Sequence, residues 1–268
     1  MLTDFSDLDH LTGGFSPGDL VLLAARPSLG KTSFALNVAA QVARDNEAVI
    51  YYSLEMKRVR VMQRLISATA GISAWNLNNG SVRPEDWPKL IRGVIEVSRY
   101  PLWVMDSPDL SFRQIRELVR NLKNDLRNSS GPPLSLMVVD YLQLMLPRAS
   151  GPEKRRRQIA EITRGLKIMA RDLAVPVLLV AGLGRTSERR NDKRPRLSDL
   201  GELEKVEQFA DTAMFLYRDE YYNPDSDDKG IAEVIVGKHR NGPTGKVQLA
   251  WMERYGKFAS LGRRVQTA

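Results

Sequence analysis

Short apolar runs alternate with longer amphipathic stretches along this chain of 268 residues. The apolar runs predict strands at residues 20–24, 48–53, 102–106, 134–141, 175–181, 212–217, 232–238 and 246–251. Helical patterns lie between the earlier runs, near residues 31–44, 57–71, 84–98, 111–127 and 153–174. Such alternation is typical of an α/β fold in which helices cover both faces of a mostly parallel sheet.

The later part of the chain predicts an antiparallel end to this sheet. The last two predicted strands flank Asn241-Gly242-Pro243-Thr244-Gly245, a turn sequence that favours a hairpin. Three segments, at 148–157, 182–208 and 219–229, are expected to be long loops, which in a compact domain are usually functional or disordered. Because neither a repeat nor a low-complexity linker interrupts the pattern, we expect one domain over residues 1–268.

The composition narrows the function classes without choosing one. Hydrophobic residues make up 43% and charged residues 27%, as in ordinary soluble proteins. No apolar run approaches the ~18 residues of a membrane span, and no signal-peptide pattern begins the chain, so we expect a cytoplasmic protein without a membrane partner. With no cysteine and two histidines, disulfides and thiolate or histidine-rich metal centres are excluded. The net charge of +8 permits nucleic-acid binding but does not establish it.

The strongest chemical motif joins the first predicted strand to the first helical stretch: Ala25-Arg26-Pro27-Ser28-Leu29-Gly30-Lys31-Thr32-Ser33. It matches the P-loop of nucleoside triphosphatases, except that Ala25 stands where the first glycine is expected. Backbone N–H groups of such a loop, with the helix N-terminus behind them, bind phosphate oxygens. Lys31 would neutralise the β- and γ-phosphates of a nucleoside triphosphate, and the Thr32 hydroxyl would ligate Mg²⁺.

Two carboxylates at predicted strand ends are candidates for the rest of this apparatus. Asp140 ends a buried strand and fits a Walker B aspartate that holds Mg²⁺, although a strand-terminal aspartate also caps following elements. Glu55 follows another strand end, on the edge of an open α/β sheet where ligands bind. It would either deprotonate the attacking water or simply favour the start of a helix.

Several longer motifs occur in order, beginning with Leu11-Thr12-Gly13-Gly14-Phe15, Pro17-Gly18-Asp19-Leu20 and the P-loop, then Ser53-Leu54-Glu55-Met56, Asp140-Tyr141-Leu142-Gln143-Leu144-Met145, Tyr217-Arg218-Asp219-Glu220 and Gly237-Lys238-His239-Arg240-Asn241-Gly242-Pro243. Over essentially its whole length the chain resembles the C-terminal ATPase domain of DnaB-type bacterial replicative helicases. In that family an Ala-Arg-Pro-Ser lead-in to the P-loop is usual.

The resemblance implies a RecA-like fold, a hexameric ring and ATP-driven 5′–3′ movement along single-stranded DNA. Lys31, Thr32 and Asp140 match the family's two Walker motifs, and Glu55 matches its catalytic glutamate. Lys238 and Arg240 match a basic pair that reaches into the ATP site of the neighbouring subunit. Primase and a helicase loader are the further partners that the resemblance suggests.

The chain departs from the family pattern at two places. Gly182 stands where the family has a glutamine that senses the γ-phosphate, and residues 201–204 read Gly-Glu-Leu-Glu instead of Arg-Glu-Ser-Gly. Arg185 and Glu202 match positions that face DNA. The basic run Arg155-Arg156-Arg157 would lie in a loop facing the central channel and compensate for lost DNA contacts, or would be a solvated helix start. The basic face Arg113, Arg116 and Arg120 is interpreted as a solvated helix surface.

Three functions therefore remain open at this point. The chain is a ring-helicase motor domain, a RecA-family ATPase with another task, or a nucleotide-gated DNA-binding scaffold with little turnover. The family's N-terminal collar domain and linker helix do not appear in the sequence. We therefore expect hexamers that are weaker than in the full family architecture and that nucleotide, DNA or high concentration favours.

Overall fold

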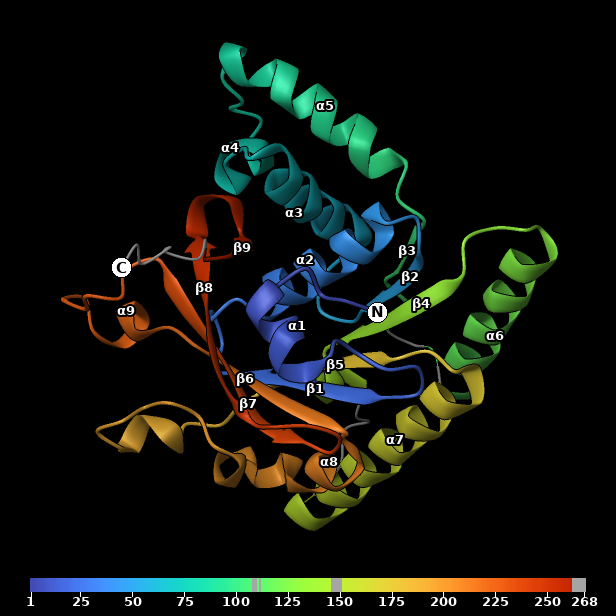
Figure 1. Cartoon of the computed structure of the whole chain (residues 1–268), viewed down its shortest axis with the longest axis vertical. Helices are drawn as coiled ribbons and strands as arrows, with labels where there is room; N and C mark the ends of the chain where they lie inside the picture. The colour runs from blue at the N-terminus through green and yellow to red at the C-terminus, as the bar shows by residue number, and fades with distance from the viewer. Residues whose placement is uncertain (108–109, 111, 146–150, 262–268) are drawn as a thin grey trace, which may run out of the picture.

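The computed structural model describes residues 1–107, 110, 112–145 and 151–261 (Figure 1). Its strands are β1 Leu20–Ala25, β2 Ala48–Ser53, β3 Leu102–Met105, β4 Leu134–Asp140, β5 Val177–Gly182, β6 Thr212–Tyr217, β7 Ile231–His239, β8 Gly245–Met252 and β9 Lys257–Ser260. Its α-helices are α1 Ser6–Thr12, α2 Lys31–Arg44, α3 Arg58–Ala70, α4 Ala74–Asn78, α5 Trp87–Ser98, α6 Phe112–Asn128, α7 Pro152–Leu173, α8 Glu204–Phe209 and α9 Asp219–Tyr222. Short 3₁₀ helices are η1 Pro84–Asp86, η2 Leu142–Met145, η3 Ser187–Arg189, η4 Leu197–Leu203 and η5 Glu253–Tyr255.

These strands form one nine-stranded sheet with the order β3-β2-β4-β5-β1-β6-β7-β8-β9. The neighbours from β3 to β6 run parallel, whereas β6–β7, β7–β8 and β8–β9 are antiparallel. The predicted α/β fold, its mostly parallel sheet and its antiparallel end are confirmed. The last strand, β9, was not predicted, because four residues beside a 3₁₀ turn carry too little periodic pattern.

Alternate residues of the central strands build a core on each face of the sheet. Val21 and Leu23 of β1 point to the face covered by α2, which contributes Phe34 and Val38. Leu20 and Leu22 point to the opposite core, which also contains side chains from α6, α7 and α8: Ile115, Leu166 and Val206. Burial on both faces explains why these strands are apolar at almost every position. Figure 1 shows α3, α4 and α5 lying beyond α2, and η5, between β8 and β9, contacts α3 and α4.

The three segments predicted to be loops contain more structure than the sequence indicated. In the first, residues 148–150 lie outside the described part, and residues 152–157 are the first turns of α7. Gly151 has φ 92° and Pro152 occupies the first helical turn, which is where a proline suits a helix. The second segment contains η3, η4 and part of α8, and the third contains α9.

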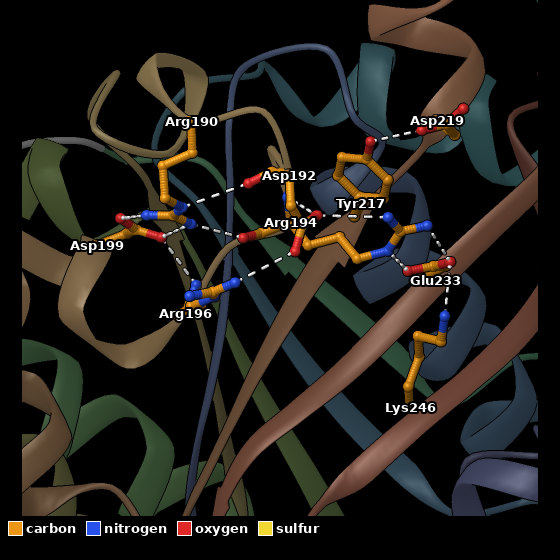
Figure 2. A network of polar contacts seen from close by, with 9 residues as sticks. All are labelled: Arg190, Asp192, Arg194, Arg196, Asp199, Tyr217, Asp219, Glu233 and Lys246. Carbon is orange, nitrogen blue, oxygen red and sulfur yellow. Dashed lines mark hydrogen bonds and ion pairs between the residues drawn. The ribbon is translucent and has the colours of Figure 1, made fainter. Parts of the chain in front are cut away.

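Ion pairs hold the second segment against the sheet (Figure 2). Arg190 binds both oxygens of Asp199 at 2.6 and 2.7 Å, which closes residues 190–199 into a compact unit. Arg194 binds both oxygens of buried Glu233 on β7 at 2.7 and 2.9 Å, and Lys246 on β8 binds the same carboxylate at 3.0 Å. These distant partners give order to a segment whose own sequence carries few apolar positions.

Candidate functional site

The P-loop lies between the end of β1 and the start of α2. Gly30 precedes the helix with φ 101°, and a side chain there would come within 2.9 Å of the Phe258 ring. Glycine is therefore required by both backbone conformation and space. No side chain caps the N-terminus of α2, so its first N–H groups remain available to an anion.

Lys31 is held over this loop in a largely buried position. Its ammonium group donates to the backbone oxygen of Arg26 at 2.9 Å. Burial lowers the pKa of Lys31 to about 8, although the nearby carboxylates of Asp140 and Glu55 act in the opposite direction. A phosphate group placed here would restore the stability of the charged form.

Asp140 is almost completely buried at the end of β4. The hydroxyl of Tyr51 donates to its carboxylate at 2.8 Å, and Thr32 also hydrogen-bonds to it. Burial raises the pKa of Asp140, while these hydrogen bonds and the charge of Lys31 lower it. Asp140 and Thr32 thus place a carboxylate and a hydroxyl together, the oxygen ligands that suit Mg²⁺.

A cleft of about 1120 Å³ opens over the P-loop, and Lys31, Thr32, Glu55 and Asp140 all line it. Glu55 is exposed, two residues beyond the end of β2. The register of β2 and β4 pairs Ser53 with Asp140, which brings these two strand ends together. The structure therefore assembles the four residues that the sequence had placed in one site.

The other predicted residues of the P-loop fall into two groups, those that line the cleft and those that do not. Pro27, Ser28, Gly30 and Ser33 line the cleft, whereas the side chains of Ala25 and Leu29 are completely buried beneath it. Arg26 is not among the residues that line the cleft. Its guanidinium binds Glu188 at 2.8 Å and the backbone oxygen of Leu183 at 2.9 Å. Arg26 therefore anchors the P-loop to the segment after β5, a role that sequence reasoning missed.

Sequence reasoning also missed the far wall of the cleft. Arg60 and Arg64 reach it from α3, and Trp251 and Tyr255 reach it from the end of the chain. Trp251 is buried and packs on the guanidinium of Arg218, 5.0 Å from the ring centroid. Helical spacing of the two arginines was the only sequence signal, and it does not distinguish a cleft wall from a solvated face.

Lys238 and Arg240 lie at the end of the sheet where β1 begins, whereas the P-loop lies at the end where β1 finishes. The register pairs Val21 with Thr212, and Thr212 with His239, so the end of β7 lies beside the start of β1. The six residues of β1 span roughly 17 Å from there to the P-loop. One chain therefore does not bring this basic pair to its own cleft.

The candidate DNA-binding residues lie at the start of α7, in η4 and after β5. Arg155 at the start of α7 binds Glu202 of η4 at 2.8 Å, and both line the cleft. Arg185 is exposed after β5. Arg156 and Arg157 are exposed on α7. The three arginines 155–157 thus belong to a helix start, not to the loop that was expected.

Gly182 ends β5 beside Gln143 of η2. The Gln143 amide donates to the Gly182 oxygen at 2.8 Å and accepts from its N–H at 3.2 Å. A Cβ at position 182 would lie 3.7 Å from the Gln143 nitrogen, an ordinary contact. Position 182 thus has room for a Cβ, and Gly182 itself lines the cleft.

A P-loop at one strand end, with a buried aspartate two strands away at the same edge, defines a RecA-like P-loop nucleoside triphosphatase. Residues 1–260 match the model of the DnaB-like helicase C-terminal domain. The chain belongs to this family.

Its relatives include replicative helicases. Replicative DNA helicase DnaB of Geobacillus stearothermophilus is 45% identical over 267 residues, which cover 99% of this chain and 58% of the relative. Replicative DNA helicase DnaC of Bacillus subtilis (strain 168) is 42% identical over 267 residues, with the same coverage of 99% and 58%. The chain thus spans a little more than half the length of these curated relatives.

Solved structures agree with the fold. One solved ATPase domain superposes with a TM-score of 0.90 and 40% identity, covering 97% of this chain and 90% of that one. A structure of a DnaB-like replicative helicase and its interactions with primase gives a TM-score of 0.89 and 40% identity, covering 97% and 61%.

Proposed function

We propose that this chain hydrolyses ATP at an interface between two copies, and that hydrolysis drives 5′–3′ movement along single-stranded DNA. The observation that carries the proposal is the separation of Lys31 and Arg240 to opposite edges of one sheet. A head-to-tail contact between copies places the basic pair of one chain over the cleft of the next. Contacts of this heterologous kind close into rings, and the proposed ring is a hexamer.

In the proposed reaction, the P-loop N–H groups and Lys31 hold the β- and γ-phosphates. Glu55 orients the attacking water and accepts its proton. The neighbour's Arg240, assisted by Lys238, stabilises the charge that develops on the γ-phosphoryl group, which is worth ~10³–10⁵ in rate for arginine fingers. Hydrolysis therefore depends on assembly.

The donor set fits Mg²⁺. Thr32 and Asp140 present two oxygen groups, and no group of three or more His, Cys, Asp or Glu side chains that would hold a metal alone occurs in the described residues. Mg²⁺ in phosphate sites is usually held by one or two protein groups together with substrate phosphates. When bound, it would neutralise charge on the β- and γ-oxygens.

Support for DNA as the partner comes from the basic residues at the start of α7 and after β5 and from the helicase relatives. Arg185, Arg156 and Arg157 are exposed, and Arg155 with Glu202 joins the start of α7 to η4. We also propose that the assembly acts in the cytoplasm with primase and a helicase loader, in line with the primase interactions of one similar structure. Among the described helices, none is long and apolar enough to cross a membrane.

Gly182 supports a second candidate, a nucleotide-gated DNA-binding scaffold with little turnover. Because glycine has no side-chain amide, no residue at this position responds to the γ-phosphate. The Gln143 amide beside it already has hydrogen-bond partners in the Gly182 backbone.

ATPase measurements over a range of protein concentrations, with and without single-stranded DNA, separate the two candidates. A motor gives turnover that rises with both, and that disappears in Lys31→Ala and in Arg240→Ala. Strand displacement on duplexes with a 5′ or a 3′ tail then tests polarity. Nucleotide binding with flat, DNA-independent turnover would reject the motor and support the scaffold.

A further inference from the structure

Asp211 connects four parts of the fold at the edge of the sheet opposite the P-loop. Its side chain is only 9% exposed, immediately before β6. The carboxylate accepts from the N–H of Leu20 at 2.8 Å, from Lys167 of α7 at 2.5 Å and from Arg240 at 3.4 Å. Its backbone oxygen also accepts from the N–H of Arg240 at 2.8 Å. Both the main chain and the side chain of Arg240 are thus fixed to one residue.

The end of α8 supplies the remaining contacts of the basic pair. Arg240 donates to the backbone oxygen of Gln208 at 2.5 Å, and Lys238 donates to that of Glu207. Carbonyls in the last turn of a helix have no partner within the helix, so they are natural acceptors for cationic side chains. Asp211 lies two residues after the end of α8. Its carboxylate adds a full negative charge beside these neutral carbonyl acceptors.

These contacts leave Arg240 free to bind something else. Its side chain remains 43% exposed and borders a surface hollow of about 450 Å³. A guanidinium has five N–H donors, and only two side-chain contacts are made here. The arginine is therefore held at a defined position while it keeps donors for an external anion.

We propose that Asp211 is a positioning residue that holds Arg240 in the geometry needed at the neighbouring ATP site. The proposal rests on the proposed function, because it requires Arg240 to act in the cleft of a second copy. An arginine side chain loses much rotamer entropy when it is fixed in one position. Restricting it before assembly removes much of that cost from the reacting complex, whereas a finger displaced by ~1 Å can lose ~100-fold in rate.

Asp211→Asn tests the proposal, since it keeps the size of the side chain and removes its charge. We expect kcat of the DNA-stimulated ATPase to fall about 10- to 100-fold, with the KM for ATP unchanged because the variant's own P-loop is intact. Asp172→Asn is the matched control. Asp172 also forms an ion pair with an arginine, Arg116, but on the exposed surface between α6 and α7, and its loss should leave kcat unchanged.

A mixing experiment separates positioning from a purely structural role. Asp211→Asn retains a working P-loop, and Lys31→Ala retains a correctly held Arg240. In random rings from an equal mixture, about a quarter of interfaces join the two intact halves, so the mixture should recover up to about a quarter of the wild-type rate. Lys31→Ala alone should stay near background, and Asp211→Asn alone should keep about one tenth to one hundredth of the wild-type rate.

Every outcome decides the matter. Recovery in the mixture supports the proposal. If the mixture gains nothing, because Asp211→Asn does not fold or damages its own cleft, Asp211 is structural and the proposal fails. A variant with wild-type kcat also overturns it while leaving the proposed function intact. Full activity of Arg240→Ala, in contrast, would reject the proposed function itself.

Discussion

Replacing Lys31 with methionine should stabilise the nucleotide-free chain at neutral pH. The reason is that folding buries the ammonium group of Lys31, which has no phosphate to neutralise it in the free protein. The pKa of Lys31 is lowered by this burial to about 8, from an ordinary value of 10.5. Methionine fills a similar volume without a charge to desolvate.

The pH dependence follows from proton binding in the two states. Below pH 8 both the folded and the unfolded chain hold the proton, so the full cost applies, at most about 3 kcal/mol. Between pH 8 and 10.5 the unfolded chain binds more protons, so the free energy of unfolding rises with pH. Above both values the cost is gone. The advantage of Lys31→Met should therefore be about 2 kcal/mol at pH 7 and should shrink toward pH 9.5.

Urea unfolding of both proteins without nucleotide, at intervals from pH 7 to pH 9.5, measures this difference. Groups that do not interact with Lys31 titrate equally in the two proteins and cancel. Lys229→Met, at an exposed position in the segment after α9, is the control and should show no pH-dependent difference from wild type. A Lys31→Met chain that is less stable than wild type at pH 7, or a gap that does not change with pH, would refute the reasoning.

Two further predictions concern Gly182 and Tyr51. Gly182→Gln should raise DNA-stimulated turnover several-fold relative to Gly182→Ala, because it adds a side-chain amide at a position that lines the cleft; equal rates for the two variants would show that the amide contributes nothing. Tyr51→Phe removes a hydrogen bond that lowers the pKa of Asp140 and should raise that pKa further. Because Mg²⁺ requires the carboxylate, ATPase activity should then be lost at a higher pH as the pH falls, and a pH–rate profile that coincides with wild type would contradict this role for Tyr51.

Much of the fold was predictable because its signals are local. The central strands are apolar at nearly every position, and Gly30-Lys31-Thr32 joins a strand to a helix in a recognisable way. The elements that were missed are short or depend on distant partners. Residues 190–199 carry no helical periodicity, and ion pairs to β7 and within the segment hold them in place.

The sequence predicted which residues form the candidate site, but not the direction of every side chain. Lys31, Thr32, Glu55 and Asp140 meet because parallel strands end at one edge of the sheet, a rule that sequence alone can apply. Arg26 was placed among the phosphate-binding residues, yet its side chain turns to Glu188. No local sequence pattern reveals that Lys31 lines the cleft and that Arg26 does not.

The sequence by itself determined the class of fold and four residues of the nucleotide cleft, Lys31, Thr32, Glu55 and Asp140, since strand periodicity, turn chemistry and the P-loop depend on neighbours along the chain. Only the tertiary structure decided where Arg240 lies. Strand order and the antiparallel direction of β7 place Arg240 at the opposite end of the strands from Lys31. There it hydrogen-bonds to Asp211 and to the end of α8. These contacts join residues remote in sequence, so their geometry exists only after the sheet has formed.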